Sequence, residues 1–345
     1  MDLRAVIRAN DPSDVVAVSS NDGFSRKLRR WSGRAIGPVL LLVIWTRIDL
    51  DATLAALSGI PPGVAAVAVG LLIPQVVLRG IRWRRLASDQ GIHMGYAEAA
   101  SAYAVAIALG SVTPGRIGEL SKVEHLRRKA GSVSRALVSV VLDRAFDLAA
   151  LAAFGAVGLA RIGGIEHTAL AAGITAGLGS AVVAIAILRR THSRSPRDQS
   201  IPPDRSLRGR LLGGLRLMVS ESAAVTVPTY LVSGGITAVV WSLHFWALSL
   251  VAQTLGIQLP FIDIAGVLAL AALAAAVPVS ILGVGTRDGA LIVLMGWYGV
   301  AAERAVALSF AILALLLVNA VLCAPALLTP AGRLSWSARD RPRSP

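Results

Sequence analysis

The fold is decided by two short sequences, VTPGRIGE at residues 112–119 and PVSILGVGTRDG at residues 278–289. Each contains helix-breaking Gly and Pro residues and an arginine with a carboxylate close behind, and each interrupts an otherwise apolar chain. Irregular backbone at membrane depth is tolerated only where protein or a water-filled cavity satisfies its polar groups. A matched pair of interrupted segments, one in each half, is typical of a transporter site near the middle of the bilayer. The two sequences therefore predict a membrane protein that handles a polar or anionic group inside the bilayer.

The composition agrees with this class. Of the 345 residues, 55% are hydrophobic and only 16% are charged, whereas a soluble domain is about a quarter charged. Apolar stretches of about 18 residues or more recur along the chain, which predicts an all-α polytopic membrane protein. The single cysteine, Cys323, excludes a disulfide framework and a multi-cysteine metal site.

The net charge of +14 raises the question of a nucleic-acid partner. Most basic residues, however, lie in short segments that flank apolar runs, as the positive-inside rule requires. We therefore expect anionic lipid headgroups, and no nucleic acid, to be the partners of these charges. The basic clusters that we expect on the cytoplasmic side are 1–34, 79–85, 122–135, 189–216 and 333–343.

The apolar runs predict about six spanning helices plus two re-entrant helical hairpins. The run 97–112 has basic clusters on both sides, so we expect it to turn back at Pro114 and Gly115 instead of crossing. The runs 264–277 and 287–300 are expected to form a second hairpin that enters from the opposite side. Two hairpins of opposite entry direction make an inverted repeat. The spans are expected at 35–46, 64–81, 136–160, 169–188, 227–253 and 306–328.

The predicted domain organisation places both termini in the cytoplasm and the protein in the cytoplasmic membrane. The loop 189–222 is interpreted as a solvated linker between the halves or, alternatively, as a basic surface that binds anionic lipid. The segments are a disordered basic leader at 1–34 without a cleavable signal, a transmembrane domain at 35–330 with halves at about 35–188 and 223–330, and a cytoplasmic tail at 331–345.

Arg116 and Arg287 are the main candidates for substrate binding. Each follows a Gly turn and is expected to open a new helix, whose first N–H groups are unpaired and partially positive. A guanidinium beside such a helix start makes an anion site, because it adds bidentate phosphate geometry. The alternative is that each arginine only pairs with a nearby carboxylate and closes its hairpin. Together with Gly115, Gly285 and Ser280, these arginines form the predicted substrate site.

Glu119 and Asp288 lie in the first turn after each break. The helix dipole alone stabilises acids at such positions. The functional interpretation is that they are counter-charges to the hairpin arginines, or groups that titrate and couple transport to proton movement. Both interpretations stay open at this point.

Asp143, Arg144 and Asp147 interrupt the apolar run at 136–160. The two aspartates are four residues apart and share one helix face. One charge at the centre of a lone membrane helix costs about 2.5–3.5 kcal/mol, so the three are expected to face the interior of the protein. There they would pair, with Arg116 or Arg287 as candidate partners, or would simply lock helices together.

Known catalytic motifs do not occur in the sequence: it has no H-E-x-x-H, Walker loop, dinucleotide fingerprint or Gly-x-Ser-x-Gly. We therefore predict no catalytic residue, no metal and no cofactor.

Three motifs in this order resemble the flippase-like transmembrane domain of lysylphosphatidylglycerol synthases, which is also filed as an uncharacterised membrane protein family. They are PGRxGE at 114–119 with basic residues at 122–129, DRxxD at 143–147, and PxSxxGxGxRD at 278–288. The resemblance covers roughly 35–330, nearly the whole chain.

The resemblance implies a lipid-moving domain. Family members with an attached catalytic domain add lysine to phosphatidylglycerol and move the product across the bilayer, and only the lipid-moving half is matched here. It thus implies translocation of an anionic phospholipid or of a lipid-linked intermediate of the polyprenyl-phosphate type. This chain has Asp143 and Asp288 where the family more often shows Glu, which shortens each carboxylate by one methylene.

Two other classes of function remain open. One is a membrane enzyme for lipid-linked substrates, with Asp143, Asp147 and Glu119 as acid/base groups or metal ligands. The other is a non-catalytic partner of an envelope-building complex that acts through the loop 189–222. The protein partner would then be an envelope-synthesis enzyme, and a second copy of the chain is the alternative.

Overall fold

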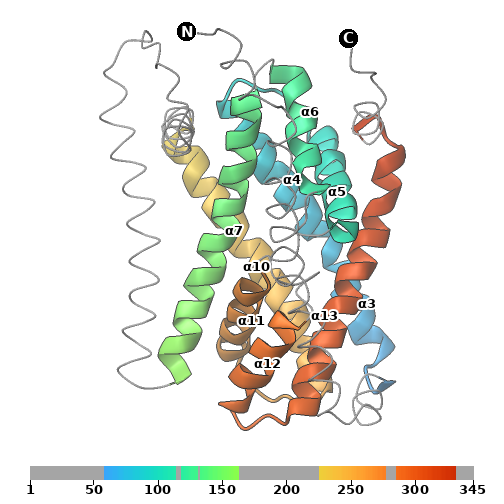
Figure 1. Cartoon of the computed structure of the whole chain (residues 1–345), viewed down its shortest axis with the longest axis vertical. Helices are drawn as coiled ribbons and strands as arrows, with labels where there is room; N and C mark the ends of the chain where they lie inside the picture. The colour runs from blue at the N-terminus through green and yellow to red at the C-terminus, as the bar shows by residue number, and fades with distance from the viewer. Residues whose placement is uncertain (1–57, 114–117, 131–132, 163–224, 277–284, 332–345) are drawn as a thin grey trace, which may run out of the picture.

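The computed structural model describes residues 58–113, 118–130, 133–162, 225–276 and 285–331. Within these ranges every regular element is a helix, as the apolar runs predicted (Figure 1). The predicted leader, the runs 35–46 and 169–188, the loop 189–222 and nearly all of the tail lie outside them. The helices are α3 (Pro62–Gly70), α4 (Leu72–Asp89), α5 (Tyr96–Val112), α6 (Ser121–Ala130), α7 (Val133–Ile162), α10 (Val227–Thr254), α11 (Phe261–Ala276), α12 (Thr286–Gly296), α13 (Ala302–Cys323) and the short 3-10 helix η4 (Ala324–Leu328).

Three long helices are apolar enough to cross a membrane: Pro62–Asp89, Val227–Thr254 and Ala302–Leu328. A fourth, α7, has 30 residues and is about 45 Å long at 1.5 Å per residue, although it carries the charged residues noted above. These helices contain the four predicted spans that fall in the described part of the chain. One boundary differs, since α4 continues to Asp89 and places the basic cluster 79–85 inside a helix instead of in a loop.

Two turns of the same design lead into the two shorter helix pairs. Gly91 after α4 and Gly256 after α10 have positive φ angles of 78° and 76°, a conformation that glycine adopts without steric cost. In each turn the amide of the next residue, Ile92 or Ile257, donates to a carbonyl in the last turn of the preceding helix, which satisfies a group that the helix end leaves unpaired. The helices that follow, α5 and α11, lie at opposite ends of the molecule (Figure 1).

The first of these pairs is an antiparallel hairpin of α5 and α6. Near its closed end, the amide of Gly118 donates to Thr113 Oγ1 at 2.8 Å. A Cβ atom on Gly118 would lie 2.3 Å from the carbonyl carbon of Leu109, so the returning chain is in direct contact with α5. At the other end, His125 Nε2 lies 2.9 Å from Glu98 Oε1.

The second pair consists of α11 and α12, which pack against each other in the lower half of the molecule (Figure 1). The tips of both pairs, 114–117 and 277–284, lie outside the described residues. The second pair forms the centre of the main hydrophobic core with α10 and α13. Fully buried side chains of that core include Phe245, Ile264, Leu291, Met295 and Leu308.

Close backbone contact joins α7 to α11. A Cβ atom on Gly266 would lie 2.4 Å from the Cα atom of Gly158, so at this crossing only glycine fits on either helix. Small residues at helix crossings are typical of membrane proteins, where backbones pack closely in the absence of a hydrophobic driving force. One turn further, Arg161 forms an ion pair with Asp263 and ties the same two helices together.

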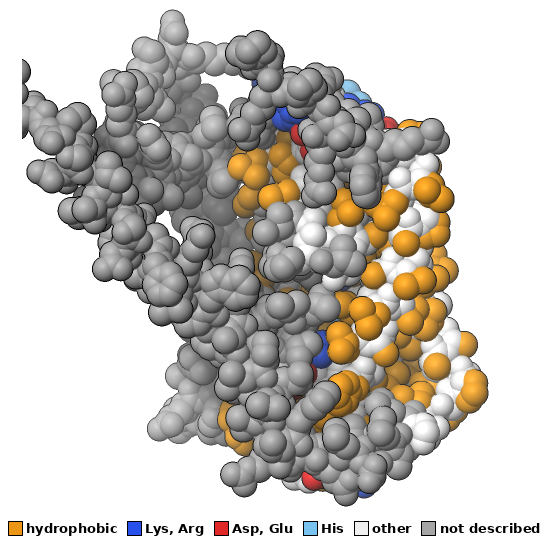
Figure 2. Space-filling view, turned by 45° about the vertical axis from the view of Figure 1, so that its right-hand side comes forward, with side chains coloured by type: hydrophobic (Ala, Val, Ile, Leu, Met, Phe, Trp, Pro, Cys, Tyr) orange, Lys and Arg blue, Asp and Glu red, His pale blue; other side chains and the backbone are white. Residues whose placement is uncertain are grey.

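The outer surface is suited to lipid. Figure 2 shows hydrophobic side chains along nearly the whole length of the described face on the right, with Lys and Arg gathered mainly near its upper end. Large exposed apolar side chains such as Leu231, Val321 and Ile73 belong to the long helices. Large contiguous apolar surfaces are rare on soluble monomers, and this one agrees with the helix composition in placing the protein in a membrane.

Candidate functional site

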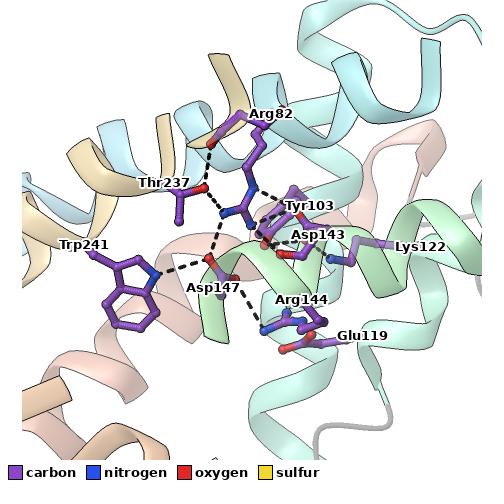
Figure 3. Close-up of polar contacts among 10 residues, drawn as sticks. Arg82, Tyr103, Glu119, Lys122, Asp143, Arg144, Asp147, Thr237 and Trp241 are labelled. Atoms are coloured by element: carbon purple, nitrogen blue, oxygen red, sulfur yellow. Dashed lines mark hydrogen bonds and ion pairs between the residues drawn. The ribbon is translucent and has the colours of Figure 1, made fainter. Parts of the chain in front are cut away.

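A buried group of charged side chains lies where α4, α5, α6, α7 and α10 meet (Figure 3). The side chains of Arg82, Lys122 and Asp143 have no exposed surface, and that of Asp147 is 8% exposed. Charges buried to this degree persist only when they are paired and hydrogen-bonded. We call the group the ionic cluster; its members are the charged residues Arg82, Lys122, Asp143 and Asp147 and the uncharged residues Tyr103, Thr237 and Trp241.

Asp143 on α7 is the centre of the ionic cluster. Its Oδ1 lies 2.7 Å from Arg82 Nη2, and its Oδ2 lies 2.8 Å from Lys122 Nζ. The hydroxyl of Tyr103 donates to the same Oδ2 at 3.1 Å. Because Arg82 is on α4, Tyr103 on α5 and Lys122 on α6, one carboxylate joins a spanning helix to both helices of the first hairpin.

Asp147 lies one turn further along the same face of α7, as its spacing of four residues from Asp143 predicted. Its Oδ1 accepts from Arg82 Nη1 at 2.8 Å and from Trp241 Nε1 at 3.3 Å. Arg82 thus bridges the two aspartates, and its Nη1 also donates to Thr237 Oγ1 at 2.8 Å. This planar fork of donors is what distinguishes arginine from lysine at a site with several acceptors.

Lys122 is held by aromatic faces as well as by a carboxylate. Its Nζ lies 4.2 Å from the ring centroid of Tyr103 and 5.9 Å from that of Trp83. A desolvated ammonium gains from the negative face of an aromatic ring. The lysine therefore has a counter-ion and two rings around it, which explains how α6 tolerates a fully buried cation.

Two further arginines lie at the edge of the ionic cluster. Arg144 forms an ion pair with Glu119, and its Nη1 lies 3.9 Å from Asp147 Oδ2. Its side chain is 36% exposed. Arg79 is one turn before Arg82 on α4, with its Cζ 5.4 Å from the ring centroid of Trp241. Glu119 lies two residues after the tip of the first hairpin, so its pair with Arg144 fixes that hairpin to α7.

The predicted residues of the second hairpin lie apart from this cluster. Arg287 donates from Nε to Ser309 Oγ at 2.9 Å, and its Nη2 lies 3.2 Å from Asp288 Oδ1. Asp288 in turn accepts from the amide of Gly285 at 2.8 Å and from the hydroxyl of Ser309. These contacts match the alternative interpretation given above, in which Arg287 pairs with the neighbouring carboxylate of Asp288 and closes its hairpin. A role for Arg287 and Gly285 in binding a substrate stays a prediction.

The partners of Asp143 and Asp147 differ from those considered from the sequence. Arg287 contacts neither of them, and Arg116 lies outside the described residues with Gly115 and Ser280. The actual partners, Arg82 and Lys122, belong to the basic clusters 79–85 and 122–135, which were expected on the cytoplasmic side and were not considered as partners of the aspartates. Each lies inside a helix and is fully buried.

The chemistry available at the ionic cluster is electrostatic. Each oxygen of Asp143 already accepts from at least one cationic donor, which leaves it poorly suited to take a proton from a substrate. Within the described ranges, no group of three His, Cys, Asp or Glu side chains is arranged to hold a metal ion. What the site offers is a set of guanidinium groups inside an apolar helix bundle.

Comparison with known protein families agrees with the motif resemblance. Residues 31–323 match the family model described as the lysylphosphatidylglycerol synthase TM region. The chain belongs to this family. The match covers both hairpins and all the residues of the ionic cluster, and it supports a membrane domain related to lipid handling. No curated protein matches the chain.

Proposed function

We propose that this member of the lysylphosphatidylglycerol synthase TM family translocates an anionic phospholipid or a lipid-linked intermediate across the cytoplasmic membrane. The observation that carries the proposal is the ionic cluster, which places charges inside a bundle whose outer surface is apolar. Ionisable residues within membrane helices are costly, and they typically mark the path of a polar substrate. A polar headgroup that crosses the hydrocarbon layer needs such a path while its acyl chains stay in lipid.

The arrangement of the hairpins supports alternating access. In the first half, Lys122 after the hairpin tip contacts Asp143 on the following long helix, 21 residues later. In the second half, Arg287 after the hairpin tip contacts Ser309 on the following long helix, 22 residues later. Together with the matched turns before α5 and α11, these contacts support an inverted repeat of two re-entrant hairpins. Movement of one repeat against the other would open the site to each leaflet in turn.

The same contacts favour translocation over catalysis. Asp143 and Asp147 are held by Arg82, and Glu119 is paired with Arg144. An acid or base has to be near the reacting atom and free to exchange a proton, whereas these carboxylates are engaged in ion pairs that join helices.

The test is a translocation assay with purified full-length chain in phosphatidylcholine vesicles that carry a fluorescent phosphatidylglycerol. Chemical quenching from outside reports how fast the label reaches the outer leaflet. We expect faster exchange than in protein-free vesicles, and unchanged lipid masses at the end. Exchange equal to that of protein-free vesicles would refute the proposal, and a new lipid product sensitive to Asp147→Asn would favour the enzyme alternative.

The predicted arginines are tested in the same assay. Arg116→Gln alone, and Arg287→Gln combined with Asp288→Asn, should abolish exchange while the amount of folded protein is unchanged. The second change is made as a pair because it removes a buried cation and its counter-ion together, so that no charge is left unpaired. Full exchange in the combined variant of all three positions would rule out a role for the hairpin arginines.

A further inference from the structure

Among the described residues, the charges around the ionic cluster do not balance. With Arg79, Arg144 and Glu119 added, the group contains four cationic side chains against three anionic ones. The cations are Arg79, Arg82, Lys122 and Arg144, and the anions are Glu119, Asp143 and Asp147. An excess positive charge in a low-dielectric interior is unfavourable unless an anion accompanies it.

Arg79 is the cation that has no carboxylate within ion-pair distance among the described residues. It lies about 15 Å along the helix from the end of α4 at Asp89, at 1.5 Å per residue. Among the described residues its contact is the ring of Trp241, and its buried Nε has no hydrogen-bond partner. Arg82, one turn away on the same helix, has instead four hydrogen bonds to acceptors on α7 and α10.

Arg144 is only partly satisfied. It is paired with Glu119 through Nη2, but its own Nε is buried without a hydrogen-bond partner. Asp147 does not supply the missing hydrogen bond, because Arg144 Nη1 lies 3.9 Å from Asp147 Oδ2, which is beyond hydrogen-bond distance. Asp147 is already bonded to Arg82 and Trp241, so three arginines surround one carboxylate: Arg79, Arg82 and Arg144.

Exposure separates these arginines into two kinds. Arg82 is fully buried and can only hold the helices together. Arg144 keeps 36% of its side chain exposed, and Arg79 is half-buried. The two incompletely paired guanidiniums are therefore also the two that a ligand can reach.

We propose that Arg79 and Arg144 together bind the phosphodiester of a lipid headgroup, with Trp241 supporting Arg79. A phosphate supplies the missing negative charge and accepts two parallel N–H bonds from a guanidinium. The inference rests on the proposed function and names the recognition groups of that site. It assigns Arg82, Lys122 and Asp143 to the scaffold, and it adds Arg79, which belongs to none of the motifs noted in the sequence.

Binding is measured apart from transport. Purified full-length chain in detergent is titrated by calorimetry with dihexanoyl-phosphatidylglycerol below its micelle concentration, and in parallel with inorganic phosphate and with dihexanoyl-glycerol. Arg79→Gln and Arg144→Gln should each weaken phosphatidylglycerol binding about tenfold or more, since each loses a hydrogen bond between charged groups. The affinity of Arg79→Lys should lie between those of wild type and Arg79→Gln, because lysine keeps the positive charge but lacks the two parallel N–H donors of the guanidinium.

Arg127 provides the matched control. It is an exposed arginine on α6 that pairs with Glu124, so Arg127→Gln removes one positive charge outside the site and should leave binding unchanged. Thermal unfolding without lipid gives a second readout. Arg79→Gln removes an excess cation and should not lower the unfolding temperature, whereas a scaffold residue would lower it.

The outcomes separate this inference from the proposed function. Unchanged phosphatidylglycerol affinity in the Arg79→Gln/Arg144→Gln variant overturns the assignment, even if the wild-type chain moves lipid. Equal affinity for inorganic phosphate or for dihexanoyl-glycerol overturns the assignment to a lipid phosphodiester. Arginine-dependent binding in a wild-type chain that does not move lipid would support the site and refute translocation.

Discussion

The charge pair between α6 and α7 gives the sharpest test of how the structure is held together. Asp143→Asn removes the only carboxylate that the structure shows within ion-pair distance of Lys122 among the described residues, and the lysine side chain has no exposed surface. Arg82 would keep Asp147 at 2.8 Å. The variant therefore leaves one buried, uncompensated ammonium, which costs about 3–5 kcal/mol.

The reverse change is milder. Lys122→Met removes the ammonium but leaves Asp143 bonded to Arg82 and to Tyr103. Methionine has a similar length and places a thioether against the aromatic rings that surround the lysine, a favourable contact. We expect a cost of about 1–3 kcal/mol for the lost charge-assisted hydrogen bond.

The double variant decides whether the two residues act as a unit. It removes one charge of each sign and leaves no unpaired ammonium, so its cost should not exceed that of Asp143→Asn, and the coupling between the two changes should be about 2–3 kcal/mol. Unfolding by sodium dodecyl sulfate in mixed micelles, followed by tryptophan fluorescence, measures these differences.

The control is the exposed pair of Glu124 and Arg127 on the same helix, where both changes to Gln should leave the unfolding midpoint nearly unchanged. Two results would contradict the reasoning. One is a double variant that costs the sum of the singles. The other is an Asp143→Asn variant within about 1 kcal/mol of wild type, which is the range of exposed charge pairs.

Two further predictions concern glycines. Gly158→Ala should destabilise the protein by about 1–3 kcal/mol through overpacking, because its Cβ would lie 2.6 Å from a backbone atom of α11. The matched control is Gly234→Ala on α10, whose Cβ would have no atom within 4 Å. This control should be neutral or should stabilise the protein by about 0.4–1 kcal/mol. Gly285→Ala should cost about 1–3 kcal/mol, because φ at this position is 87°. Thermal unfolding in detergent checks both, and a Gly158→Ala variant as stable as Gly234→Ala would show that the backbones are not in contact.

The helices were predictable because apolar runs of sufficient length have few alternatives in a membrane. The conflict between the run 97–112 and its basic flanks predicted that the chain turns back near Pro114, and α5 and α6 do pack side by side, whereas re-entry from the cytoplasm stays a prediction. The same rule did not identify Arg82 and Lys122 as partners of the buried aspartates, because it uses basic residues only to assign the side of the membrane. A fully buried arginine looks the same in sequence as one at the membrane surface, and its partner Asp143 is 61 residues away.

The partners of the two aspartates could have been found from the sequence by balancing the buried charges. The sequence indicated that Asp143 and Asp147 face the interior, and two buried carboxylates require about two buried cations. This requirement made the basic residues of neighbouring helices, such as Arg82 and Lys122, better candidates for the partners than Arg116 and Arg287. The repeated Gly-Ile at Gly91 and Gly256 was also visible, and it marks where each half turns into its hairpin. No periodicity in the sequence gives the crossing of α7 and α11.

The ionic cluster also constrains how a translocator of this design moves. A buried ion pair adds little to stability compared with apolar packing of similar volume, so its value lies in fixing which helices stay together. Lys122 cannot leave Asp143 without becoming an unpaired charge inside the helix bundle, so we expect α5 and α6 to move together with α7. Arg287 also bonds Ser309 on α13, but its counter-ion Asp288 lies on the same helix, so this contact can break without leaving a charge unpaired. Under the proposed function we therefore expect α4, the first helix pair and α7 to move as a unit that contains both Arg79 and Arg144. The close contact of Gly158 with Gly266 makes α11 follow α7.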